Sequence, residues 1–219
     1  MSCTLYASDS SGNVYSLDCA SGSAYLIDER IAARIEELGL SGLSDIACHG
    51  NTLWGVSLDQ LIRIDLRTAD VTVIGDIGFS DVVALAVAST GIIYGGTISG
   101  EFLWIDPATG AGNGINTIGF GGFAGDMAFD CNDNLFASVN DKTLLVRIDV
   151  ETGTAGAIGP INYKGVQGLA FYCCHLYGVT GSGLVMTINT YSGEGTPIGD
   201  DGIKFSGMTV CCCNCGCGC

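Results

Sequence analysis

The chain has 219 residues, of which only 14% are charged and 34 are glycine. This composition is typical of short apolar strands joined by tight turns, and it argues against helices with solvated faces. The formal net charge of −15 repels phosphate groups, so the sequence predicts neither nucleic acid nor an anionic membrane surface as a partner.

No segment is predicted to span a membrane. The longest apolar run, residues 82–94, is interrupted at 89–91 and is too short to cross a bilayer. The first residues lead directly into a strand pattern, without the basic and apolar regions of a signal peptide. Three explanations stay open: a cytosolic chain, export by another route, or a leader removed before this numbering begins.

The chain begins with two predicted strands and a helix. The apolar–aromatic–small triplet 5–7 and the alternating run 14–18 have the period of two that is typical of strands. Residues 28–38 instead place their apolar side chains at helical spacing. They predict a short amphipathic helix, inserted before the next strand.

From residue 45 onward the sequence repeats a unit of four short strands. A small-residue strand opens each unit, at 45–48, 84–87, 126–129, 168–171 and, last, 207–210. The apolar–aromatic–small triplet follows at 53–55, 93–95, 135–137 and 176–178. An alternating strand ending in Asp or Asn comes next, at 62–65, 103–106, 146–149 and 186–189. The fourth strand ends in Ile-Gly, at 74–75, 118–119, 158–159 and 198–199.

Four short strands that recur roughly every 40 residues predict an all-β fold, a β-propeller. The chain starts at a second strand and ends with a fifth small-residue strand, so the C-terminal strand is expected to complete the first blade. The sequence therefore predicts five four-stranded blades, closed by that strand. The predicted domains are the propeller, residues 1–210, and a cysteine-rich tail, residues 211–219.

The repeat pattern Leu-Tyr-Gly…Leu-x-x-Ile-Asp-x-x-Thr-Gly…Ile-Gly resembles bacterial β-propeller repeats of the quinoprotein and lactonase-like type. The resemblance covers residues 4 to about 210, and the tail beyond it resembles the clustered thiolates of metallothioneins. Propellers of this kind host binding, hydrolysis, lyase and structural roles, so the resemblance implies an architecture and not an activity.

The twelve cysteines and both histidines are predicted to gather on one face of the disc. In a four-stranded blade, the turn after the first strand lies on the same face as the turn after the third. Cys48, Cys131, Cys173 and Cys174 fall in the first kind of turn, and Cys19 falls in the second. Packing in small apolar pockets is the alternative for Cys19, Cys48 and Cys131.

Metal binding is one chemistry that this face predicts. Thiolates and imidazoles select copper(I) or zinc, and the tail has the spacings Cys-x-x-Cys and Cys-x-Cys-x-Cys. Copper is the predicted ion and zinc is the alternative. The candidate ligands are Cys211, Cys212, Cys213, Cys215, Cys217, Cys219, Cys173, Cys174, His175, Cys48, His49 and Cys3.

Disulfide bonding is the other chemistry, and the two can coexist. Twelve is an even number of cysteines, and their density is high for a reducing compartment. Disulfides from the tail to the propeller would hold the strand that closes the ring, but the pairing stays open.

The sequence predicts no enzyme. Two histidines offer little general-base capacity, and no Gly-x-Ser-x-Gly motif is present. Asp45 and Asp126 begin small-residue strands at the mouth opposite the cysteines. We interpret them as turn formers, with ligation of a cation or a sugar hydroxyl as the alternative.

These observations favour a non-enzymatic structural propeller that self-assembles into an extracellular filament or surface layer. Its cysteine face would join copies of the chain through metal ions or disulfides, so the predicted partners are the chain itself and metal ions. The alternatives are a soluble metal-sequestering module and a carbohydrate-binding or lactonase-like propeller. The predicted location is extracellular or at the cell surface, with the cytoplasm as the alternative.

Overall fold

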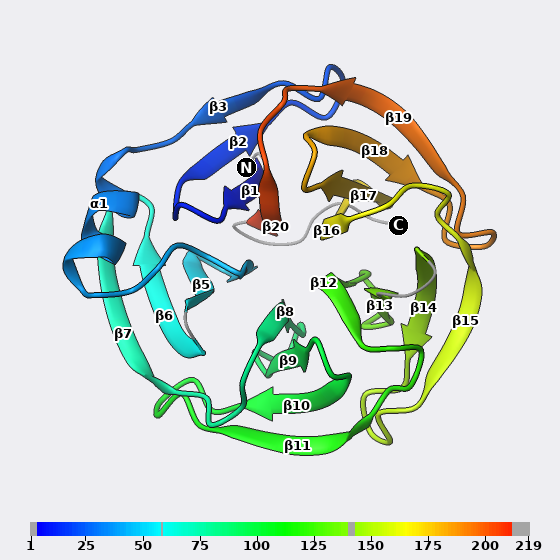
Figure 1. Ribbon diagram of the computed structural model, residues 1–219, viewed down its shortest axis with the longest axis horizontal. Helices are drawn as coiled ribbons and strands as arrows, with labels where there is room; N and C mark the ends of the chain where they lie inside the picture. The colour runs from blue at the N-terminus through cyan, green and yellow to red at the C-terminus, as the bar shows by residue number, and fades with distance from the viewer. Residues whose placement is uncertain (1–3, 58, 140–142, 212–219) are drawn as a thin grey trace.

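The structure is a computed structural model and describes residues 4–57, 59–139 and 143–211. Within those ranges the chain forms twenty strands and one helix. The strands make five four-stranded antiparallel sheets, which surround a central axis as the blades of a propeller (Figure 1). The predicted fold class and blade number are confirmed.

Each blade is one sheet, whose first strand lies nearest the axis and whose fourth strand lies at the rim. From the axis outward, blade 1 consists of β20 (Phe205–Cys211), β1 (Thr4–Asp9), β2 (Val14–Leu17) and β3 (Ala24–Leu26). Blade 2 consists of β4 (Asp45–His49), β5 (Thr52–Ser57), β6 (Gln60–Asp65) and β7 (Asp70–Asp76). Blade 3 consists of β8 (Val82–Val87), β9 (Ile93–Thr97), β10 (Glu101–Ile105) and β11 (Gly112–Thr117). Blade 4 consists of β12 (Phe123–Phe129), β13 (Leu135–Val139), β14 (Leu144–Ile148) and β15 (Ala155–Pro160). Blade 5 consists of β16 (Val166–Tyr172), β17 (His175–Thr180), β18 (Leu184–Ile188) and β19 (Gly195–Asp200).

Apolar side chains between neighbouring blades form the core. The second strands β9 and β13 are buried along their whole length, because both of their faces pack against other blades. The outer strands β7, β11, β15 and β19 contain only half-buried and exposed residues. The outer strands at the rim are therefore the least buried part of each of these four blades.

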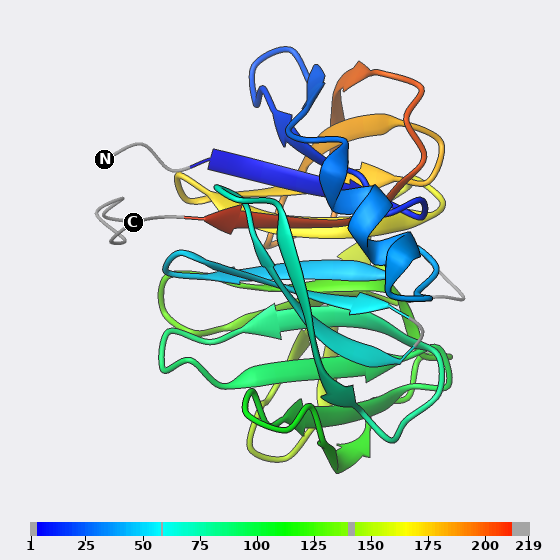
Figure 2. The ribbon, with the colours of Figure 1, turned by 90° about the vertical axis from the view of Figure 1, so that its left-hand side faces the viewer.

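The first and the last strand of the described residues meet in blade 1. Strand β20 is antiparallel to β1, with Cys211 opposite Thr4 and Met208 opposite Ala7. Figure 1 shows β20, at the end of the colour scale, beside β1 at its start. In Figure 2, the beginning of β1 and the end of β20 lie on the same side of the molecule. The prediction that the C-terminal strand closes the first blade is confirmed.

The predicted helix is present as α1 (Arg30–Glu37), which is shorter than the 28–38 segment of the sequence pattern. It lies between β3 and β4 along the chain and at the outside of the ring (Figure 1). Ile31 and Ile35 are its buried residues and join a cluster with Leu43 and Ile46. No helix in the described part of the chain is long and apolar enough to cross a membrane.

Gly207 shows how closely the inner strands approach one another. A Cβ at this position would lie 2.1 Å from Asp45 Oδ1 and 2.8 Å from Asp45 Cα. We expect Gly207→Ala to lower the free energy of unfolding by about 1–3 kcal/mol, because β4 must move to make room. Gly156→Ala is the matched control, since a Cβ there meets nothing within 4 Å. Equal urea midpoints for the two variants would contradict this packing.

Candidate functional site

A cavity of about 720 Å³ lies on the propeller axis. Equivalent residues of the five inner strands line it at the same level, namely Ala47, Ala86, Ala128, Ala170 and Thr209. From these residues the cavity extends to the turns at which the inner strands end. The site is therefore an apolar shaft with a polar, sulfur-containing mouth.

Several of the predicted cysteines meet at this mouth. Cys48, Cys131, Cys173, Cys174 and also His49 line the same cavity, although they come from three different blades. The prediction that these residues share one face is confirmed.

Cys19 lies farther from the axis, where it packs in the apolar cluster of blades 1 and 5. Burial raises the pKa of the Tyr177 hydroxyl, and the neighbouring Cys19 raises it further. The small-pocket interpretation therefore fits Cys19.

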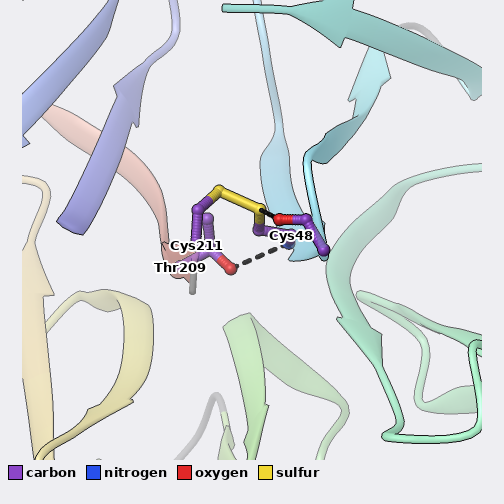
Figure 3. Close-up of a disulfide and its surroundings, with 4 residues drawn as sticks. Cys48, Thr209 and Cys211 are labelled. Atoms are coloured by element: carbon purple, nitrogen blue, oxygen red, sulfur yellow. Dashed lines mark hydrogen bonds between the residues drawn. A yellow bond between two sulfur atoms is a disulfide. The ribbon is translucent and has the colours of Figure 1, made fainter. Parts of the chain in front are cut away.

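A disulfide joins Cys48 to Cys211 at the edge of the mouth, with their Cα atoms 5.2 Å apart (Figure 3). The two residues are 163 positions apart in the sequence. Next to the disulfide, the backbone N–H of Cys48 donates a hydrogen bond of 2.9 Å to Thr209 Oγ1. These two links attach β20 of blade 1 to β4 of blade 2, so the strand that closes the ring is fixed from its side as well as through its own sheet.

The disulfide reduces the number of thiolates on this face that can bind a metal ion. Cys48 and Cys211, paired with each other, supply no thiolate. Across residues 4–57, 59–139 and 143–211, no three or more His, Cys, Asp or Glu side chains are arranged to hold an ion. The predicted ligands Cys3, Cys212, Cys213, Cys215, Cys217 and Cys219 lie outside the described residues. Copper or zinc binding stays a prediction.

Cys173 and Cys174 form the hairpin turn between β16 and β17. Tyr172 pairs with His175 across this turn, and both cysteines have positive φ angles, 45° and 65°. A two-residue turn with two positive φ angles is usually made by Asn and Gly, which tolerate this conformation. In this chain the turn exposes two adjacent thiol-bearing side chains instead.

His175 has a defined orientation beside these cysteines. Its Nδ1 lies 2.9 Å from the carbonyl oxygen of Cys173. A carbonyl only accepts hydrogen bonds, so Nδ1 carries a proton, and in the neutral imidazole the lone pair is then on Nε2. This is the tautomer in which a histidine can coordinate a metal ion through Nε2.

Asp45 and Asp126 form a buried carboxyl pair, and no part of either residue is exposed. Asp45 Oδ1 accepts the N–H of Ile46 at 2.7 Å, and its Oδ2 accepts the N–H of Leu85 at 2.6 Å. Asp126 accepts three further N–H groups, from Met127, Leu169 and Met208. The five donors belong to the inner strands of the five blades, one from each. The pair thus connects every inner strand at the axis.

The two carboxyls hydrogen-bond each other and share a proton. Burial raises the pKa of both groups well above the usual range for aspartate, because a charge inside the protein loses its hydration. The hydrogen bond between them raises the pKa of Asp45 and lowers that of Asp126.

The sequence interpretation of these two aspartates was wrong. They are neither turn formers nor ligands at an open mouth: Asp45 is the first residue of β4, Asp126 lies within β12, and both are fully buried. A signal was present: the equivalent positions of the other three inner strands hold Ala84, Gly168 and Gly207. A Cβ at Gly207 would collide with Asp45 Oδ1, so the glycine there leaves room for the carboxyl side chain that blade 2 contributes.

Comparisons with known proteins show the fold alone. No family model matches the chain, and no curated protein matches it. A chain in the crystal structure of a nidogen/laminin complex is 13% identical with a TM-score of 0.67, over 96% of this chain and 82% of that one.

Two further similar structures cover a smaller share of their own chains. A structural genomics protein of unknown function from Bacteroides thetaiotaomicron VPI-5482 is 15% identical with a TM-score of 0.62, over 89% of this chain and 54% of that one. Hydrazine synthase from Kuenenia stuttgartiensis is 17% identical with a TM-score of 0.53, over 72% and 48%. The chain is a β-propeller, and the quinoprotein or lactonase-like type of its repeats stays a prediction.

The disulfide is expected to stabilise the closed ring. Replacing both of its cysteines, Cys48→Ala with Cys211→Ala, should lower the free energy of unfolding by about 2–5 kcal/mol, because the unfolded chain is no longer constrained by a long loop. Denaturant unfolding of the oxidised protein measures this. His49→Ala, at the exposed position next to Cys48, leaves the link intact; it is the control and should change stability by less than about 0.5 kcal/mol. A similar loss in both proteins would contradict the role given to the disulfide.

The carboxyl pair predicts how stability depends on pH. The folded protein holds a proton on the pair at pH values where the unfolded chain has lost it, so stability must fall as pH rises above the ordinary aspartate range. The slope is at most about 1.4 kcal/mol per pH unit for one proton. Urea unfolding between about pH 5 and 8 measures it, because turn aspartates with a lowered pKa have finished titrating there. Those aspartates are held by backbone N–H groups: Asp18, Asp65, Asp106 and Asp149.

Asp45→Asn is the matched variant for this pH dependence. Its amide can donate to Asp126 as the protonated carboxyl does, but it loses one of the two backbone N–H bonds. We expect lower stability at every pH and a flatter slope. A slope equal to that of the unaltered protein would show that the pair does not hold the proton.

Proposed function

We propose that this chain is a non-enzymatic structural propeller of an oxidising compartment, at the cell surface or outside the cell, and that it associates with copies of itself into filaments or layers. The Cys48–Cys211 disulfide is the observation that carries the proposal. Disulfides persist in oxidising compartments and are rare in the reducing cytosol. This one adds a covalent link to a ring that is otherwise closed by strand pairing, packing and hydrogen bonds.

The chemistry at the axis supports a role without catalysis. Asp45 and Asp126 would be the natural acid–base pair, but their oxygens accept five backbone N–H groups and are closed off from solvent. Their burial also weakens the carbohydrate-binding and lactonase-like alternative, which relied on these two carboxyls. His49 is the histidine that lines the cavity.

Exposed apolar side chains support self-association. Tyr191 is 94% exposed at the tip of an outer turn, and Tyr25 and Leu26 are 62% and 49% exposed on the short outer strand β3. Strand β3 lies at the edge of blade 1, where unpaired backbone groups can bind another strand. These features suit contacts with a second copy of the chain.

A metal-sequestering module is the second candidate. The observation that favours it is the turn with Cys173, Cys174 and His175, where two thiols lie next to an imidazole with its Nε2 lone pair available. Copper(I) is the preferred ion and zinc the alternative. In the first proposal, the self-assembling structural propeller, the same ions would join copies of the chain.

The size of the protein in solution tests the proposal. We expect multi-angle light scattering on protein isolated without reductant or chelator to show an average mass that rises with concentration. The measurement is repeated after chelation and after adding copper or zinc, which separates metal-linked association from metal sequestering by a monomer. A monodisperse monomer at high concentration under all three conditions would overturn self-assembly.

A further inference from the structure

In blades 2 to 5, the inner strand directly precedes the other three strands of its blade in the sequence. In blade 1, the inner strand is β20, which is the last strand of the described residues. The groups that bind β20 all lie in other strands. Strand β1 pairs with β20, and Cys48 forms the disulfide and donates its backbone N–H. Asp126 accepts the N–H of Met208. None of these groups distinguishes the chain's own β20 from that of a second copy.

We propose that β20 is an exchangeable strand: the groove between β1 and β4 binds β20 of a second copy, and a Cys48–Cys211 disulfide between the two chains then seals the contact. The inference rests on the proposed self-association and names the surface, the partner and the covalent link that produce it.

The groove must be filled by some β20. Phe205 and Met208 are each 1% exposed, and they pack with Leu5, Ala7 and Val179 in one apolar cluster. An empty groove would expose this cluster to water, which is unfavourable in proportion to the apolar area uncovered. A propeller that gives its own strand away therefore has to accept another.

The connection before β20 permits this exchange. Strand β19 ends at Asp200 and β20 begins at Phe205, and residues 201–204 between them have no regular structure. Four extended residues span about 13 Å, which is enough to direct the strand away from its own blade. Short hinges of this kind are where domain swapping occurs.

Protein concentration decides which strand fills the groove. A chain's own β20 must first close a loop that spans almost the whole sequence, from Thr4 to Cys211. The effective concentration of such an internal strand is on the order of millimolar, so only a dense population of copies competes with it.

Exchange also determines the kind of assembly that forms. Each copy gives one strand and receives one. Two copies that exchange reciprocally make a closed dimer, and copies that pass the strand onward make an open chain. The open chain has the geometry that a filament needs.

Oxidation seals the exchanged strand in two steps. The Cys211 thiolate attacks a low-molecular-weight disulfide such as oxidised glutathione, forms a mixed disulfide and releases one glutathione thiol. The Cys48 thiolate of the receiving copy then attacks the Cys211 sulfur and releases the second glutathione thiol. Two protein thiols are oxidised and one glutathione disulfide is reduced, so the electrons balance.

Complementary variants test the inference. One copy carries Cys48→Ser and ¹⁵N, and the other carries Cys211→Ser without label, so neither can form the link within itself. The two are mixed in denaturant with reductant and refolded together at high concentration with oxidised glutathione. Proteolysis and mass spectrometry without reductant then search for a labelled Cys211 peptide linked to an unlabelled Cys48 peptide. A labelled copy with Cys48→Ser and Cys211→Ser is the control for links from neighbouring cysteines.

We expect the mixed link with the first pair, its loss in the control, and a lower yield when refolding is done at low concentration. Wild-type chains, half of them labelled, serve as a second measurement that needs no variant to fold. In fully exchanged protein about half of all Cys48–Cys211 links then join a labelled to an unlabelled chain.

Absence of mixed links in refolded wild-type protein at high concentration would overturn strand exchange. If that protein still self-associates by light scattering, the proposed function stands and only the exchange fails. If it stays monomeric, both fail.

Discussion

The fold depends on one pair of buried carboxyls at the propeller axis. A ring of blades has no strand at its centre, so the inner strands need another connection there. Asp45 and Asp126 provide it by accepting one backbone N–H from each of the five inner strands. Two buried carboxylates would repel each other strongly, and the shared proton removes one charge. The connection is thus made of hydrogen bonds, and it depends on the pair staying protonated.

The disulfide at the mouth and the carboxyl pair deeper on the axis both hold the strand that closes the ring. Strand β20 carries both connections, through the N–H of Met208 to Asp126 and through Cys211 to Cys48. The strand that closes the ring is therefore tied to its neighbours by covalent and polar links outside its own sheet. Closure of the ring therefore depends on β20. For the same reason, the proposed assembly depends on whether β20 stays with its own chain.

Sequence periodicity was sufficient for the architecture, because each strand repeats its pattern in every blade. Triplets such as 93–95 and Ile-Gly ends such as 158–159 mark equivalent strands without any tertiary information. The shared face of Cys48, Cys131 and Cys173 followed from the same logic. The pairing of Cys48 with Cys211 did not, since twelve cysteines allow many connectivities and the partners are 163 residues apart. The carboxyl pair was missed because its contacts cross the axis between blades. The pattern within one strand does not show which residues of different blades meet there.

Amide hydrogen exchange of the five N–H groups at the axis tests the central claim most directly. We predict that Ile46, Leu85, Met127, Leu169 and Met208 in the oxidised protein exchange only through global unfolding, with one common free energy of opening. Faster exchange at Met208 than at the other four would show that β20 opens alone. In that case neither the carboxyl pair nor the disulfide would hold the ring closed.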